Sequence, residues 1–211
     1  VDNLSRFLTD DDQNLKYIAL LALVKMLPTH AHLVALHQET ILHSLRHPDL
    51  TIRLRSLDLA CGLASRTNLY RIVTALVTYL ADEHSEDASS ALLATINGST
   101  SSAESSNFRM QVAESILDLG CANDYGDIPD YVWYFDLLLR LTEQYVHISA
   151  RAADQIIVIA SRDENARTEV ISRLRSIVDD CVDKPELLRA GAWIWGEYPD
   201  EVEDAPELIR A

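Results

Sequence analysis

Histidine is the residue type whose density in this sequence most invites a chemical role. Five of the seven histidines lie between His30 and His47, and imidazole nitrogens are common zinc ligands. The spacing does not suit a metal site. His47 precedes Pro48, and a residue before proline is pushed out of helical geometry, so His43 and His47 need not share a helix face. We therefore predict no metal ligands and interpret these histidines as solvated groups near helix ends.

Motifs for nucleophilic or phosphate chemistry do not occur in the sequence. No Gly-x-Ser-x-Gly pentapeptide is present, and Gly98-Ser99 lies in a polar segment without a supporting strand. The six glycines are isolated from one another, so none forms a glycine-rich phosphate loop. The acidic runs at residues 10–12 and 179–180 fit helix ends, where they cap the backbone. The sequence predicts no catalytic residue and no cofactor.

The cysteines point to a reducing environment. Cys61, Cys121 and Cys181 are far apart, none belongs to a Cys-x-x-Cys pair, and an odd number cannot close a disulfide framework. Each lies among apolar residues of helical pattern, where a free cysteine usually acts as a small hydrophobic group. We expect a cytosolic chain with unreactive thiols.

Aromatic residues gather in two places and are candidates either for the core or for a partner surface. At helical spacing beside leucine and isoleucine, such rings usually pack between helices, and we expect that here. The alternative is an anchor for a partner or a platform for bases. The residues concerned are Tyr131, Trp133, Tyr134, Phe135, Trp193 and Trp195.

Composition favours helices and disfavours anionic partners. The 211 residues are 48% hydrophobic and include only six Gly and six Pro, which predicts an all-α chain with a sizeable core. The formal net charge of −15 repels nucleic-acid phosphates and anionic lipid headgroups. The longest apolar run, residues 17–24, is too short to cross a bilayer. Because the sequence has no initiator Met and no signal peptide, we expect a fragment.

An internal repeat predicts the architecture. Residues 12–27 align with residues 49–64 at an offset of 37 residues, with apolar positions in register. This offset is close to the roughly 40-residue period of HEAT and armadillo units, in which helical hairpins stack. We predict an α-solenoid, with one helix ending at Pro28 and the next opening at Pro48 and Asp49.

One segment breaks this rhythm. Residues 84–107 are crowded with Ser, Thr, Gly and Asn, and their only apolar stretch is short. We predict a flexible surface loop, since such composition does not bury enough apolar surface to order itself.

Several runs together resemble a known family. Residues 12–23, 56–62, 67–77 and 131–141 look like the trunk of adaptor-complex large chains, the adaptins, in the same order and spacing. Residues 51–69, the Asp-Tyr then Val-Trp-Tyr run at 130–134 and the run at 192–197 are most similar to the delta class of that family. Residues 84–107 and the acidic end after Glu197 depart from the family's pattern.

The resemblance implies a non-enzymatic solenoid covering residues 1–211, which scaffolds a vesicle-coat adaptor complex. It implies a beta-type large chain, a medium chain and a small chain as partners. It also implies an Arf-family GTPase and cargo sorting signals acting through the whole complex. The complex would lie on Golgi or endosomal membranes and carry cargo toward the lysosome or vacuole. Another adaptor large chain, of the gamma, alpha or epsilon class, and a generic armadillo-type peptide receptor are the alternatives.

Overall fold

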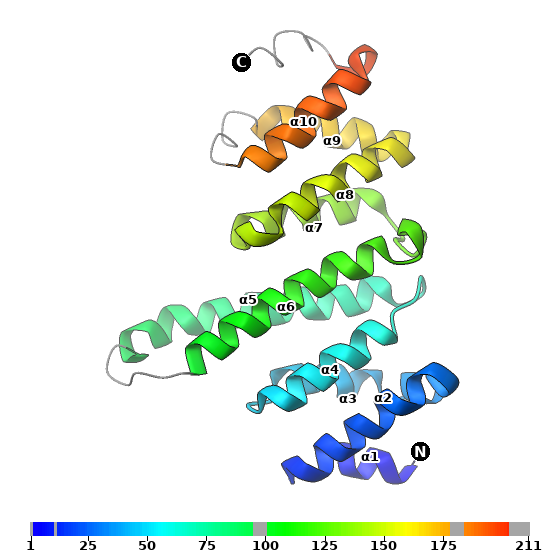
Figure 1. The fold of residues 1–211 in the computed structure, drawn as a ribbon, viewed down its shortest axis with the longest axis vertical. Coiled ribbons are helices and arrows are strands. Elements are labelled where there is room, and N and C mark those ends of the chain that lie inside the picture. The colour runs from blue at the N-terminus through cyan, green and yellow to red at the C-terminus, as the bar shows by residue number, and fades with distance from the viewer. Residues whose placement is uncertain (1, 11, 95–100, 178–183, 203–211) are drawn as a thin grey trace. The chain divides into compact units, whose positions relative to one another are not determined.

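The computed structural model describes residues 2–10, 12–94, 101–177 and 184–202 (Figure 1). The regular structure in these ranges is helical and includes no strand, which confirms the all-α prediction. The chain divides into two compact units, Val1–Leu119 and Gly120–Ala211, and each is described by itself. Whether residues 1–211 form a single solenoid stays a prediction.

The first unit consists of six α-helices and one short 3-10 helix in the described residues. Its elements are α1 (Asp2–Leu8), α2 (Gln13–Ala35), α3 (Gln38–His43), η1 (Ser44–Arg46), α4 (Leu50–Gly62), α5 (Leu69–Ala94) and most of α6 (Ser101–Cys121). Helix α2 packs on α1 and α4, and α4 packs on α3 and η1. The Tyr79 ring of α5 meets the Phe108 ring of α6 edge-on at 5.6 Å.

The second unit repeats the same arrangement. After the end of α6 come η2 (Ala122–Tyr125), α7 (Tyr131–Gln144), η3 (Val146–Ile148), α8 (Ser149–Arg162), α9 (Glu164–Ile177), α10 (Pro185–Glu197) and η5 (Pro199–Glu201). Helix α8 packs on α7, α9 and α10, and α7 packs on α9. In both units a helix therefore contacts its hairpin partner and its counterpart in the next hairpin, which is the packing of a HEAT-like solenoid, as predicted.

Side-chain carboxylates begin three of these helices, two of them at predicted positions, Asp12 and Asp49. Asp12 Oδ1 accepts from Asn14 N at 2.8 Å, and Asp49 Oδ1 accepts from Thr51 N at 2.7 Å. Asp130 Oδ1 accepts from the backbone at the start of α7. Each bond satisfies a helix-start N–H that has no partner within the helix.

The prediction that a helix ends at Pro28 is wrong by two residues. Helix α2 continues through Pro28 and breaks at His30, which has φ −136° and ψ 42°. Proline removes one N–H and crowds the preceding turn, so it bends a helix without fixing the residue at which the helix breaks.

The predicted loop at residues 84–107 is helical at both ends. Helix α5 continues to Ala94 and α6 begins at Ser101, while residues 95–100 lie outside the described residues. The flexibility of this segment stays a prediction.

Helix α2 is more apolar than a search for continuous runs indicates. Within the described residues it alone is long and apolar enough to cross a membrane, with a mean hydropathy of 1.6 and 22% of that window buried. Length and composition alone are weak evidence for a membrane-spanning helix, because the core helices of soluble proteins also meet these two criteria. The absence of a membrane span stays a prediction.

Candidate functional site

The histidines predicted to be solvated lie along a corner of the first unit. His30 and His32 are exposed beside the break in α2, with ring centroids 6.4 Å apart. His43 ends α3, and His47 follows η1 in an extended conformation, with φ −67° and ψ 142°. His43 and His47 therefore do not share a helix face, as predicted. The described residues include no group of three His, Cys, Asp or Glu side chains placed to hold a metal ion.

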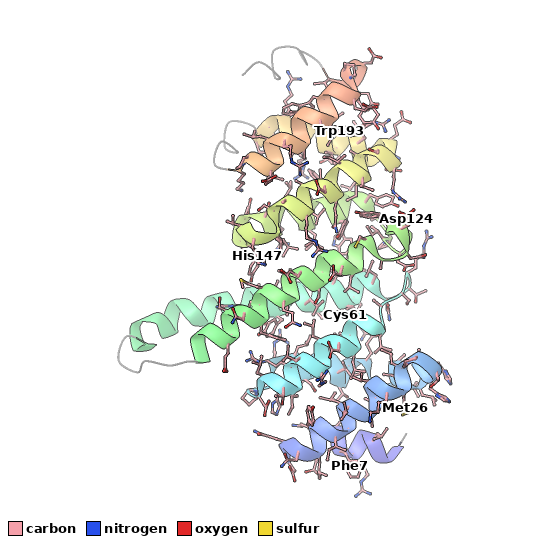
Figure 2. The ribbon with its side chains drawn as sticks, in the orientation of Figure 1. Phe7, Met26, Cys61, Asp124, His147 and Trp193 are labelled. Carbon is pink, nitrogen blue, oxygen red and sulfur yellow. The ribbon has the colours of Figure 1, made fainter. Side chains whose placement is uncertain are left out.

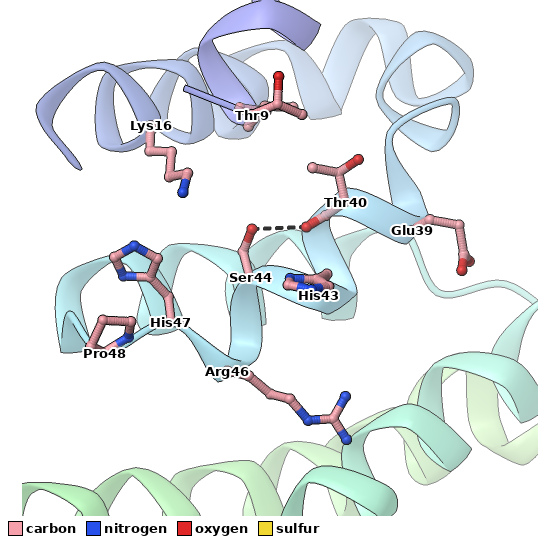
Figure 3. Close-up of a pocket in the computed structure, with 10 residues that line it drawn as sticks. Thr9, Lys16, Glu39, Thr40, His43, Ser44, Arg46, His47 and Pro48 are labelled. Carbon is pink, nitrogen blue, oxygen red and sulfur yellow. Dashed lines mark hydrogen bonds between the residues drawn. The ribbon is translucent and has the colours of Figure 1, made fainter. Parts of the chain in front are cut away.

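The structure brings His43 and His47 together in a pocket that sequence reasoning missed (Figure 3). The pocket has a volume of about 570 Å³ and lies between α2 and the segment formed by α3 and η1. Lys16 extends into it from α2 toward His47. The lining residues are Leu8, Thr9, Lys16, Glu39, Thr40, His43, Ser44, Arg46, His47 and Pro48.

A second pocket lies on the other side of the same segment, facing α5. Its volume is about 480 Å³. Glu39, His43 and Arg46 line both pockets, so the α3–η1 segment forms a ridge between them. The remaining lining residues are Leu42, Leu45, Arg71, Thr74, Ala75, Thr78 and Tyr79.

Three cationic side chains, Lys16, Arg46 and Arg71, line the two pockets together with the carboxylate of Glu39. Two exposed ion pairs cross the second pocket, Arg46 with Asp82 and Arg71 with Glu39. Lys16 has no ion pair with any residue that the structure describes. Burial, followed by the positive charge of Lys16, lowers the pKa of His47 below 6.5, because both disfavour the imidazolium. His47 Nδ1 accepts from Asp49 N at 3.1 Å.

Cys61 lies in a smaller pocket between α4 and α6, with a volume of about 300 Å³ (Figure 2). Burial raises the pKa of its thiol to about 11, and a hydrogen bond with Ser115 opposes that shift. A thiol with so high a pKa is a poor nucleophile near neutral pH. Neither Cys61 nor Cys121 takes part in a disulfide, and Cys181 lies outside the described residues.

Three of the six residues in the aromatic clusters are buried in the core. Tyr134, Phe135 and Trp195 are buried, and Tyr134 Oη donates to Gln155 Oε1 at 2.6 Å. Tyr131 and Trp133 are half-buried. Trp193 is 44% exposed on α10, so the prediction of a core role is wrong for this residue (Figure 2).

A left-handed turn after α6 is a second feature that the sequence did not indicate. Asn123, Asp124 and Tyr125 have φ values of 48°, 53° and 63°, a backbone region that residues other than glycine rarely adopt. Arg162 Nη1 donates to Asp124 O at 2.6 Å, Arg162 Nη2 donates to Asp124 Oδ1 at 2.5 Å, and the guanidinium lies 5.1 Å from the Tyr125 ring centre. Side-chain contacts therefore hold the strained backbone in place.

The prediction that the acidic runs cap helices is confirmed for the run at residues 10–12, where Asp12 and Asp10 are described. Asp12 caps α2, and Asp10 Oδ1 accepts from Asp12 N at 3.0 Å. Residues 11, 179 and 180 lie outside the described residues.

Comparison with known proteins gives a family match along the whole chain. The family model described as Adaptin N terminal region matches residues 1–211. AP-3 complex subunit delta-1 of Bos taurus is 29% identical over 224 residues, covering 100% of this chain and 17% of the relative. AP-3 complex subunit delta of Dictyostelium discoideum is 26% identical over 220 residues, covering 100% of this chain and 17% of the relative.

Relatives of the gamma class match less well. AP-1 complex subunit gamma-like 2 of Mus musculus is 25% identical and covers 95% of this chain and 22% of the relative. The chain thus spans 17% of the length of the first two relatives, and the comparison favours the delta class over the gamma class.

Proposed function

Because this chain belongs to the Adaptin N terminal region family, we propose that it is a scaffold segment of a vesicle-coat adaptor large chain of the delta class. The observation that carries the proposal is the family match over residues 1–211, on a chain whose described residues build stacked helical hairpins. The scaffold has no catalytic role and needs no cofactor.

The mechanism is mechanical. Hairpins that contact only their neighbours form a rigid support because each buries an apolar face against the next. In the second unit, Phe135, Leu138, Ile156 and Ile194 are all 0% exposed. Partner chains would bind the outer surfaces, where an apolar centre with a polar rim supplies affinity.

The proposed partners are those of an adaptor complex of this class. They are a beta-type large chain, a medium chain and a small chain, with an Arf-family GTPase and cargo sorting signals acting through the complete complex. The site of action is the cytosolic face of Golgi or endosomal membranes, from which cargo travels to the lysosome or vacuole. A net charge of −15 supports protein partners over nucleic acid.

Affinity purification of the endogenously tagged gene product, followed by mass spectrometry, tests the proposal. We expect beta-type, medium and small adaptor chains of complex 3 to co-purify. Leu138→Asp places a charge at a fully buried position and should abolish recovery, whereas Leu36→Asp changes a residue that is 73% exposed and should preserve it. Recovery of complex 1 chains would replace the delta class with the gamma class. Recovery of no adaptor chain from the tagged wild type would overturn the scaffold proposal.

A further inference from the structure

The two pockets beside the α3–η1 segment exist because that segment is short. Helix α3 has 6 residues and η1 has 3, whereas the neighbouring helices α2 and α5 have 23 and 26. Pro48 follows η1 after one intervening residue and disfavours further helix there. The short segment leaves a hollow on each side, and three of its side chains, Glu39, His43 and Arg46, line both hollows.

These hollows are cationic in a chain that is strongly acidic as a whole. Lys16, Arg46 and Arg71 line them; Arg46 pairs with Asp82 and Arg71 pairs with Glu39, so the positive charge of Lys16 is the one that no described ion pair balances. The contrast with a formal net charge of −15 makes this a local feature and not a consequence of composition. A ligand that complements this region is anionic.

The two arginines are available to such a ligand. Arg46 pairs with Asp82 at side-chain exposures of 49% and 57%, and Arg71 pairs with Glu39 at 63% and 71%. Ion pairs this exposed contribute little stability, because water competes for both partners. Carboxylates of a bound ligand can therefore exchange for Asp82 and Glu39 at small cost.

We propose that an extended segment of a partner protein, rich in aspartate and glutamate, binds across the α3–η1 segment. Its carboxylates meet Lys16 in the first pocket and Arg46 and Arg71 in the second. Its apolar side chains enter the hollows against Pro48 in the first pocket and Leu42 in the second. An extended peptide suits the arrangement because the two pockets lie on opposite sides of a ridge, so the ligand must cross it.

A lipid surface suits the same charges less well. A membrane would have to approach the whole acidic chain, whereas a peptide meets only the cationic region. The proposal is also independent of the coat-scaffold function, since its test uses the 211-residue chain alone, and either one can fail without the other.

Fluorescence anisotropy with a labelled peptide that alternates glutamate and leucine tests the proposal. The glutamine counterpart of the peptide is the neutral control. Lys16→Glu and Arg71→Glu should each weaken binding by roughly tenfold or more, since like charges repel the ligand. Lys25→Glu lies on the same helix as Lys16 and Arg66→Glu precedes α5, and both side chains are exposed outside the pockets. These matched variants should change affinity by less than about twofold, because they alter only the long-range field.

The histidine resonances locate the ligand. The His47 imidazole resonances should shift on addition of the peptide, whereas those of His147 in the second unit should not. Circular dichroism confirms that each variant is folded, and Arg71→Gln replaces Arg71→Glu if the latter is not.

The proposal is overturned by equal binding of the two peptides, by equal effects of pocket and control variants, or by no binding. It is also overturned if vesicles containing phosphatidylserine bind through Lys16 while the peptide does not bind.

Discussion

Gly120 on α6 lies against Tyr134 and leaves no room for a methyl group. A Cβ at position 120 would lie 1.7 Å from Tyr134 Oη and 2.2 Å from Tyr134 Cζ. Tyr134 is 1% exposed, and its hydroxyl donates to the buried Gln155. Gly120→Ala must therefore displace the Tyr134 ring and break a buried hydrogen bond.

The magnitude follows from three contributions. Overpacking a core costs about 1–3 kcal/mol. Leaving a buried polar group without its partner costs about 1–3 kcal/mol. Replacing glycine by alanine inside a helix stabilises the folded state by about 1 kcal/mol, because alanine has the higher helix propensity. We expect Gly120→Ala to lower the free energy of unfolding by about 3 kcal/mol.

Gly196→Ala is the matched control. The same change on α10 meets nothing within 4 Å, so only the helix-propensity gain remains. Because Gly196 lies near the helix end, that gain should be about 0.5 kcal/mol.

Urea unfolding followed by tryptophan fluorescence measures both variants. The three tryptophans are Trp133, Trp193 and Trp195, all in the second unit, so the signal reports the unit that contains Gly120 and Tyr134. With a urea dependence of about 2 kcal/mol per molar, Gly120→Ala should lower the midpoint by about 1–2 M. Gly196→Ala should raise it slightly.

Equal midpoints for the two alanine variants would refute this reasoning. A double-variant cycle adds a second check. Gly120→Ala should cost less in a Tyr134→Phe background, because the hydroxyl nearest the new methyl group is gone.

Three further predictions concern single side chains. Arg162→Lys should lower the urea midpoint relative to Arg140→Lys, because lysine cannot both donate twice to Asp124 and cover the neighbouring ring. Alkylation of Cys61 at pH 8, resolved by peptide mass spectrometry, should be about 100-fold slower in the folded chain than in urea, because its pKa rises from 9.0 to about 11. Because the pKa of His47 is lowered in the folded chain, the unfolded chain binds more protons just below pH 6.5. The free energy of unfolding should therefore fall as the pH drops from 6.5 toward that lowered pKa. His47→Gln should flatten this part of the pH profile, which urea unfolding measures.

The repeat could be predicted from sequence because helical period and burial coincide. Leu20 aligns with Leu57 and Leu23 with Ala60, and all four are buried where α2 and α4 pack together. Local spacing is enough for this inference, since side chains at helical intervals share a face.

The exposure of Trp193 follows from the same geometry, although it was not predicted. Trp193 and Trp195 are two residues apart, so on a helix they point in nearly opposite directions. Once Trp195 packs in the core at 3% exposed, Trp193 faces away from it. The core prediction treated the two as a cluster, which their spacing does not permit.

The pockets could not be predicted because their cationic residues come from distant parts of the chain. Lys16 lies beside the α3–η1 segment in the first pocket and Arg71 lies beside it in the second, which requires α2, this segment and α5 to fold together. The sequence indicated the histidines but not the lysine or the arginine. The left-handed turn at Asn123 to Tyr125 likewise depends on Arg162, which lies far along the chain.

Reconstitution tests the central claim most directly. The full gene product would be co-expressed with the beta-type, medium and small chains of adaptor complex 3 from the same organism and analysed by size-exclusion chromatography with light scattering. The scaffold account predicts one species that contains a single copy of each chain, and its loss with Leu138→Asp but not with Leu36→Asp. Elution of the gene product alone, with the other three chains unassociated, would contradict it.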